Sequence, residues 1–175
     1  IIGKILKSEI KDIGIPKKGT PQGGIISPLL ANICMNEFDW WLSNQWETFK
    51  TEYKYCNLSN RYRSLKKSNL KEFYFVRYAD DFKIFCKDYE TARKLFIGSK
   101  MWLKDRLGLE ISEEKSKITN IRKNYTEFLG FKLKGIINKN KIVCISKMND
   151  KAKKKVVKNI KNQVKKTVEK LIRSS

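Results

Sequence analysis

The chain has 175 residues, 41% of them hydrophobic, and 39 Lys and Arg against 18 Asp and Glu give it a formal net charge of +21. This apolar content excludes a globally disordered chain, and no apolar run is long enough to cross a membrane. The absence of histidine excludes Ser-His or Cys-His nucleophiles and Cys/His zinc sites. The excess of positive charge predicts a polyanionic partner, with nucleic acid first and an anionic membrane surface as the weaker alternative.

The first predicted element is a helix over residues 1–13, in which isoleucine and leucine recur at helical spacing. We expect it to end at Gly14. The loop that follows, residues 17–28, has three glycines within six residues, which lets its backbone approach a flat or charged partner closely. An ordinary glycine-rich connection is the alternative, but it leaves the Thr-Pro-Gln between the glycines unexplained.

Ser27 and Pro28 predict the start of a second helix, with serine at the N-cap and proline at the first helical position. An apolar stripe at helical spacing follows: Leu29, Leu30, Ile33, Cys34, Phe38, Trp41 and Leu42. The N-terminus of such a helix, preceded by exposed backbone N–H groups, favours anions such as the phosphates of a nucleotide.

The stretch from Asn44 to Glu72 is polar, aromatic and basic, and Lys and Arg outnumber acids seven to two between Lys50 and Glu72. Aromatic residues among cations are typical of stacking on bases with neutralisation of phosphates. An amphipathic helix with a solvated charged face explains any single residue equally well. We interpret the stretch as an insertion and keep RNA contact as a hypothesis. Its aromatic residues are Trp46, Phe49, Tyr53, Tyr55 and Tyr62.

Residues 73–86 hold two runs rich in aromatic and β-branched residues on either side of Asp80 and Asp81. This pattern predicts strand, tight turn, strand, with the carboxylates at the bend. Adjacent side chains in a regular strand point to opposite faces, whereas at a turn both can approach one site. Two close carboxylates repel each other unless a cation such as Mg²⁺ neutralises them. Taken alone, the pair favours a solvated hairpin turn over a metal site, because Asp is a common turn residue.

A helix is predicted from Tyr89, with Asp88 as its N-cap and Gly108 at its end. One face should pack on the sheet: Ala92, Leu95, Phe96, Ser99 and Leu103. The remaining predicted elements are a short strand at Leu109–Ser112, a lysine-bearing loop at 113–118, a strand at Thr126–Leu133, a turn at Gly135–Lys141 and a strand at Ile142–Ser146. Gly130 is expected where another chain passes closely.

Beyond Asn149 the sequence predicts a basic amphipathic helix. Its apolar stripe is Val156, Val157, Ile160, Val164, Val168, Leu171 and Ile172, with lysine at most other positions. A coiled-coil strand and a tail are alternatives, but a helix lying along a nucleic-acid backbone accounts for charge and pattern together.

Four motifs occur in one order and together resemble a reverse transcriptase. Their sequences resemble those of the group II intron-encoded reverse transcriptase/maturases. They are Gly19-Thr20-Pro21-Gln22-Gly23-Gly24 through Ile33, Arg77-Tyr78-Ala79-Asp80-Asp81-Phe82, Leu107-Gly108-Leu109-Glu110-Ile111-Ser112 through Ile118, and Phe128-Leu129-Gly130-Phe131. The resemblance covers about residues 1–145, and the lysine-rich end matches the family's thumb by position and character. Retron, diversity-generating and CRISPR-associated polymerases are alternatives, although the two glycines after Gln22 favour the intron class.

The resemblance implies an α+β fold, the palm of a right-hand polymerase, with a small antiparallel sheet backed by helices. The palm would occupy residues 1–146, and residues 147–175 would begin a helical thumb or maturase region. Asp80 would be the main ligand of two Mg²⁺ ions, or Mn²⁺ in substitution, with Asp81 beside it. Lys115 would act near the leaving group as a general acid, with Lys117 as the rival candidate.

The resemblance also implies the substrate contacts. Pro21, Gln22 and Gly23, together with Tyr78 and Ala79, would contact the incoming nucleotide and the template–primer. Phe128, Leu129 and Gly130 would form the primer grip.

The implied function is RNA-directed DNA synthesis, with intron RNA, an RNA template–DNA primer duplex and dNTP as partners, in the cytoplasm of a bacterium and without a membrane. An RNA-binding maturase module without synthesis is the alternative. Two-metal polymerases need a further carboxylate, which in this family precedes the helix over residues 1–13, as do the fingers. We therefore expect this chain alone to be inactive.

Overall fold

The computed structural model describes residue 14, residues 26–139 and residues 141–174. The chain divides into two units, Ile1–Ser116 and Lys117–Ser175, which are taken separately below. The helix expected over residues 1–13 and the loop from residue 15 to residue 25 lie outside the described residues. No helix among the described residues is both long and apolar enough to span a membrane.

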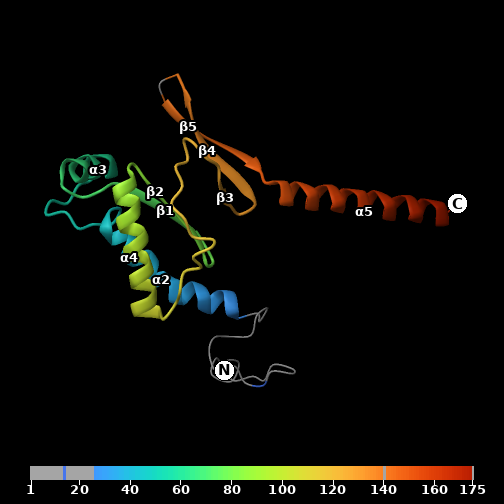
Figure 1. The fold of residues 1–175 in the computed structure, drawn as a ribbon, viewed down its shortest axis with the longest axis horizontal. Coiled ribbons are helices and arrows are strands. Elements are labelled where there is room, and N and C mark those ends of the chain that lie inside the picture. Colours follow the sequence, from blue (N-terminus) through green and yellow to red (C-terminus); the bar gives the residue numbers. More distant parts are fainter. Residues whose placement is uncertain (1–13, 15–25, 140, 175) are drawn as a thin grey trace. The chain divides into compact units, whose positions relative to one another are not determined.

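In the described part of the first unit, helices pack beside a β-hairpin (Figure 1). The elements are α2 (Ser27–Gln45), α3 (Leu58–Lys67), β1 (Phe73–Tyr78), β2 (Asp81–Cys86) and α4 (Tyr89–Leu107). Its buried core consists of Met35, Phe38, Leu42, Trp46, Leu65, Phe73 and Leu103. The rings of Trp41 and Trp102 stack at 5.6 Å between α2 and α4. Gly98 faces the same contact, because a Cβ there would lie 3.6 Å from the Trp41 ring.

Helix α2 differs from the prediction in two ways. Ser27 is its first residue rather than its N-cap, and Ile26, which precedes it, makes no side-chain cap bond. The predicted stripe is right only toward the C-terminal end, where Phe38 and Leu42 are fully buried. Met35 is buried although it was not in the stripe, whereas Leu29, Ile33 and Cys34 are exposed. The reason is that Phe38 packs on Phe82 and Trp102, so the core meets only the later turns of α2.

The predicted start and end of helix α4 are confirmed. The Asp88 side chain accepts a hydrogen bond from the Thr91 backbone N–H at 2.8 Å, and Gly108 ends the helix in the left-handed region with φ of 62°. Asp88 also accepts from the Thr91 hydroxyl, and these bonds lower the pKa of the Asp88 carboxyl. Ser99 and Leu103 on the predicted face are buried.

The second unit is a three-stranded antiparallel sheet followed by a long helix. Its elements are β3 (Thr126–Phe128), β4 (Phe131–Asn138), β5 (Lys141–Met148) and α5 (Asp150–Ser174). The predicted basic helix is therefore confirmed. The side chains of its stripe are all exposed: Val156, Val157, Ile160, Val164, Val168, Leu171 and Ile172.

Three strand predictions are wrong in detail. The strand expected over Thr126–Leu133 is a hairpin, because Leu129 and Gly130 take φ of 49° and 82° and reverse the chain. Gly130 thus serves a turn, and the start of the following helix passes it closely, because a Cβ on Gly130 would lie 3.6 Å from the Cβ of Ala152. Gly135–Asn138 belongs to β4 instead of a turn, and Leu109–Ser112 forms no strand, since Leu109 N–H bonds back to the Leu103 carbonyl at 3.0 Å. Among the described residues the strands thus form two sheets, one in each unit, rather than a single small sheet.

Candidate active site

The β1–β2 hairpin carries the adjacent carboxylates, and its turn is where the sequence predicts it. The strands pair antiparallel from Phe73 opposite Cys86 to Tyr78 opposite Asp81, so only Ala79 and Asp80 connect them. Ala79 takes φ of 53°, in the left-handed region that two-residue hairpin turns require. Asp80 therefore lies in the turn, and Asp81 is the first residue of β2.

The side chains of Asp80 and Asp81 are both exposed. Neither carboxylate makes a hydrogen bond or an ion pair with another side chain among the described residues. Both are available to a ligand, and carboxylate oxygens are the ligands that Mg²⁺ prefers. The turn therefore offers two donors suited to a hard divalent cation.

No larger metal-binding group is found in the part of the chain that the structure describes. There, no cluster of three or more His, Cys, Asp or Glu side chains could hold a metal ion. A pair of carboxylates fits divalent metal only in part, because a complete site needs further oxygen ligands, which substrate phosphates and water often supply.

Arg77 is the most connected side chain at this end of the hairpin, and sequence reasoning gave it no role. Its Nε and Nη2 donate to the two carboxylate oxygens of Asp39 on α2 at 2.8 and 2.5 Å. Its Nη1 donates to the Asn32 side chain at 2.9 Å and to the Ala79 backbone carbonyl at 2.7 Å. One guanidinium thus joins α2 to the turn that carries Asp80.

The burial of this ion pair follows from the strand period. Side chains alternate along β1, so Arg77 shares the inward face with Phe73 and Phe75, while Tyr78 points the other way. The Arg77 side chain is only 11% exposed and that of Asp39 29%. Hydrogen bonding to Asp39 raises the pKa of the Arg77 guanidinium, which stays charged at any ordinary pH.

A sequence signal for this contact exists. Asn32 and Asp39 are seven residues apart, which places them on the same face of a helix. An arginine at an inward position of a strand needs such a partner, because an unpaired buried charge is costly. The structure shows that Asp39 is this partner, because its carboxylate is held by Arg77.

Lys115 lies in a turn of the segment after α4 and is exposed. The segment is held to α4 by an ion pair between Lys100 and Glu113 at 2.6 Å and closed by a bond from Ser116 N–H to the Ser112 carbonyl at 2.9 Å. No hydrogen bond or ion pair among the described residues links Lys115 to Asp80 or Asp81. Its role as a general acid, and that of Lys117 as its rival, stay predictions.

Phe128, Leu129 and Gly130 lie at the tip of the β3–β4 hairpin in the second unit, and Leu129 is 47% exposed. Asn149 ties this tip to α5. Its N–H donates to the Gly130 carbonyl at 2.8 Å, and its side-chain oxygen accepts from the Ala152 N–H at 2.7 Å. The other expected substrate residues, Pro21, Gln22 and Gly23, lie outside the described residues.

The chain is similar to known proteins over residues of both units. The family model described as reverse transcriptase (RNA-dependent DNA polymerase) matches residues 6–133. Protein YkfC of Escherichia coli strain K12 is 30% identical over 147 residues, which cover 76% of this chain and 38% of that protein. The group II intron-encoded protein LtrA of Lactococcus lactis subsp. cremoris is 30% identical over 154 residues, covering 66% of this chain and 26% of that protein.

A third relative comes from a eukaryote. The putative COX1/OXI3 intron 2 protein of Saccharomyces cerevisiae is 29% identical over 150 residues, which cover 66% of this chain and 17% of that protein. The matched region thus spans between 17% and 38% of the length of these three relatives.

Proposed function

This chain belongs to the reverse transcriptase (RNA-dependent DNA polymerase) family, and from that premise we propose that it carries the metal-binding hairpin of a group II intron-encoded enzyme. The observation that carries the proposal is the two-residue turn at Ala79 and Asp80, inside the matched region, where two consecutive residues carry exposed carboxylates with no partner among the described residues. The similarity to intron-encoded proteins favours this class over a retron, diversity-generating or CRISPR-associated polymerase.

In the proposed reaction, the primer 3′-oxygen attacks the α-phosphorus of a dNTP, the new P–O bond forms, and pyrophosphate leaves. Asp80 and Asp81 would hold the divalent cations. When bound, Mg²⁺ or Mn²⁺ neutralises phosphate charge and favours the ionised 3′-hydroxyl. Arg77 holds the carbonyl of Ala79 and thereby the turn. Because phosphoryl transfer depends mainly on positioning and charge, carboxylates and cations suffice without histidine.

The remaining predicted residues act on substrates in this proposal. Tyr78 and Ala79 flank Asp80 and contact the nucleotide or the primer terminus, together with Pro21, Gln22 and Gly23. Lys115 donates a proton to the departing pyrophosphate. Phe128, Leu129 and Gly130 hold the primer strand.

The proposed partners are intron RNA, an RNA template–DNA primer duplex and dNTP. A net charge of +21 supports a second role in the same protein, in which its surface binds intron RNA as a splicing maturase. Residues 1–146 would form part of the palm and residues 147–175 the start of the thumb or maturase region.

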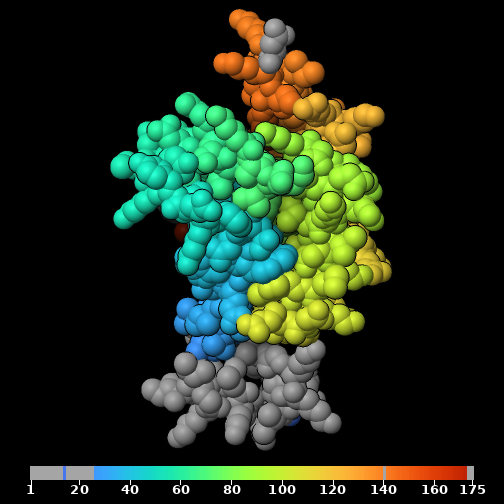
Figure 2. All heavy atoms as spheres, turned by 90° about the vertical axis from the view of Figure 1, so that its left-hand side faces the viewer, coloured from blue at the N-terminus to red at the C-terminus, as the bar shows by residue number. Residues whose placement is uncertain are grey.

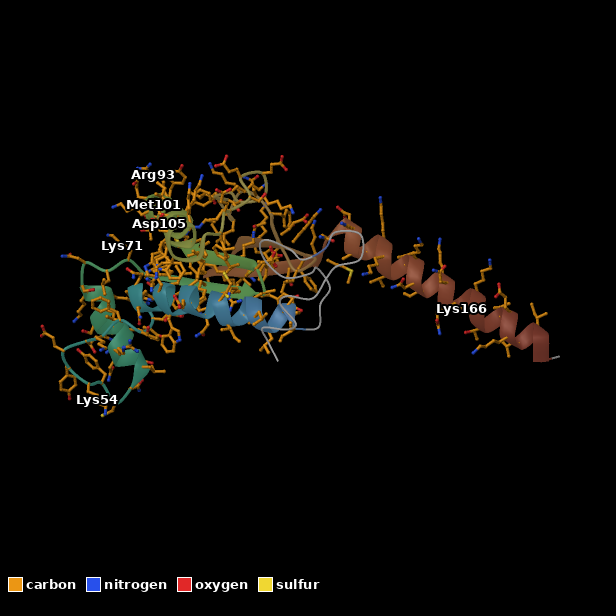
Figure 3. All side chains as sticks on the ribbon, turned by 90° about the horizontal axis from the view of Figure 1, so that it is seen from below. Lys54, Lys71, Arg93, Met101, Asp105 and Lys166 are labelled. Atoms are coloured by element: carbon orange, nitrogen blue, oxygen red, sulfur yellow. The ribbon has the colours of Figure 1, made fainter. Side chains whose placement is uncertain are left out.

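Replacement of both carboxylates in the full-length protein tests the proposal. We expect Asp80→Ala with Asp81→Ala to abolish primer extension on an RNA template and to leave the dissociation constant for intron RNA unchanged within twofold. Asp105→Ala is the matched control, because Asp105 is an exposed carboxylate on α4 (Figure 3). Full DNA synthesis by the double variant would refute the metal-binding role. Loss of RNA binding together with synthesis would mean that the two carboxylates maintain the folded structure.

A further inference from the structure

A projecting lobe of the first unit combines exposed aromatic rings with unpaired cations. The lobe consists of the loop over residues 49–57 and α3, and Figure 2 shows it standing out beyond the packed part of α2 and α4. It holds six Lys and Arg and a single acid, Glu52. Lys54 lies at its outer end (Figure 3).

The structure separates the aromatic residues of this region into two groups. Trp46 is fully buried in the core, and Tyr62, which is partly buried, stacks against it with ring centroids 6.5 Å apart. Phe49 and Tyr53 are 40% and 67% exposed. Tyr55 meets Tyr53 edge to face at 4.9 Å, which holds the Tyr53 ring while leaving most of it open to solvent.

The cations of the lobe are equally available. Lys50, Lys54, Arg63 and Lys67 are exposed and make no ion pair with another described residue. Lys66 pairs with Glu72 at 3.0 Å, and Arg61 donates to the Phe49 carbonyl at 2.9 Å. Four positive charges therefore remain for an outside partner.

The loop is held in place before any ligand binds. The bond from Arg61 to Phe49 ties the loop to α3, and the Thr51 hydroxyl donates to the Tyr53 carbonyl at 2.8 Å. Asn57 caps α3 by accepting from the Ser59 N–H at 2.8 Å. A preorganised loop loses less entropy on binding than a flexible one does.

We propose that this lobe is a binding site for single-stranded nucleic acid, with a base stacked on Tyr53 and phosphates held by Lys50 and Lys54. Rings alternating with cations match the repeat of base and phosphate along a strand, and stacking requires bases that are not already stacked in a duplex. An anionic membrane fits less well, because α3 packs its apolar side chains Tyr62 and Leu65 on the core instead of presenting them outward.

This site is separate from the proposed polymerase site. α3 leads into β1 at Phe73, whereas Asp80 follows the other end of that strand (Figure 1). A six-residue strand spans about 17 Å between its terminal Cα atoms. The lobe therefore adds a contact for a strand beyond the reacting centre, and it can exist whether or not the chain supports synthesis.

The test measures binding of a fluorescent single-stranded oligonucleotide to the full-length protein at several salt concentrations, with RNA, DNA and duplex probes. We expect Tyr53→Ala with Tyr55→Ala to weaken single-strand binding by roughly fivefold or more, since a stacked base contributes that much, without changing the salt dependence. Tyr89→Ala is the matched control, because Tyr89 is 64% exposed on α4. It should have no effect.

A variant that removes two positive charges should change the salt dependence, which the tyrosine variant leaves unchanged. Lys50→Gln with Lys54→Gln should make the slope of log K against log salt shallower by about 1.4, because each single-strand phosphate contact contributes about 0.7. Lys94→Gln with Lys104→Gln on α4 removes the same charge elsewhere and should leave the slope unchanged. A larger loss of affinity for RNA than for DNA would identify RNA as the ligand. Equal losses of affinity would mean that the site does not distinguish ribose from deoxyribose.

A crosslinking experiment locates the contact directly. Oligonucleotides containing 4-thiouridine should crosslink to a peptide within residues 49–67 of the wild-type protein and of the Asp80→Ala, Asp81→Ala protein, which separates this site from catalysis. No crosslink in this range, or equal effects of the tyrosine variant and Tyr89→Ala, would overturn the inference and leave the proposed function intact. Unchanged strand binding with loss of binding to phosphatidylserine vesicles or to an acidic peptide would also overturn it.

Discussion

Among single residues, Arg77 makes contacts with distant parts of the chain that the pattern of its own strand does not specify. Its fork of donors spans Asp39, Asn32 and the Ala79 carbonyl, so a single side chain fixes the turn of the hairpin on α2. Lysine cannot reproduce this, because an ammonium group is a point charge without the planar fork that matches a carboxylate. The interaction is mostly buried, so removal of one partner would leave the other charge uncompensated.

Replacement of Arg77 should therefore damage activity more than folding. We expect Arg77→Lys in the full-length protein to cost about 2 kcal/mol or less of the free energy of unfolding, while lowering kcat for primer extension at least tenfold and raising the Mg²⁺ concentration needed. Urea unfolding and extension kinetics measure the two effects. Arg93→Lys, at an exposed position on α4, is the control. An unchanged kcat and Mg²⁺ requirement for Arg77→Lys would show that Arg77 serves the fold alone.

Cys86 differs from the other three cysteines. Burial, with a smaller effect of the Asp88 charge, raises the pKa of its thiol from 9.0 to about 11, whereas Cys34, Cys56 and Cys144 are exposed. Because the thiolate is the nucleophile, we expect Cys86 to react with iodoacetamide at pH 8 roughly a hundredfold more slowly than they do. Peptide mass spectrometry over time measures each rate. The difference should disappear in urea, and a rate for Cys86 equal to the others in the folded protein would contradict the prediction.

Among the helices and strands, the start of α5 and the β3–β4 turn form one connected piece. Asn149 caps α5 through its side-chain oxygen, donates from its amide to Glu127 at 3.2 Å and bonds the Gly130 carbonyl through its backbone. Lys132 on β4 pairs with Asp150 at 2.6 Å. The direction in which α5 leaves the sheet is thus linked to the turn at Gly130, the proposed primer grip.

Loss of the cap should be visible as loss of stability in this unit. We expect Asn149→Ala to reduce the free energy of unfolding by about 1 kcal/mol, the usual contribution of an N-cap side chain, as measured by urea unfolding followed by circular dichroism. Asn162→Ala is the matched control with the opposite sign. Asn162 is exposed inside α5, where alanine favours the helix by a few tenths of a kcal/mol. Equal effects of the two variants would argue against the cap.

For the molecule as a whole, the described residues do not hold a complete site for metal ions. They contain two carboxylates at one turn and no cluster of three possible ligands, and the matched region spans at most 38% of the three relatives compared. Two-metal polymerisation needs carboxylates from more than one segment, so we propose that the rest of the site comes from the parent protein.

It follows that the 175-residue chain should be inactive alone. We expect no primer extension above background by the purified chain at Mg²⁺ or Mn²⁺ concentrations at which the full-length protein is active. Circular dichroism confirms in the same preparation that the chain is folded. Templated extension by the chain, abolished by Asp80→Ala, would show that it holds a complete site.

Features that depend on neighbouring residues could be predicted from the sequence. The turn between β1 and β2, the cap at Asp88, the end of α4 at Gly108 and the helix beyond Asn149 all follow from local backbone preference and period. The order of the four motifs likewise pointed to the reverse transcriptase family, which the family match confirms. Interactions within one element are encoded in a few consecutive residues, so they can be read there.

The side chains that those elements bring together depend on tertiary packing. Packing placed Met35 rather than Ile33 in the core, buried Trp46 and left Tyr53 open, and paired Arg77 with Asp39. It also divided the strand at Leu129 and Gly130, where only Gly130 is a usual turn residue and Leu129 takes φ of 49°. Such outcomes depend on which faces of distant elements pack, and a pattern within one element cannot specify the surface that meets it.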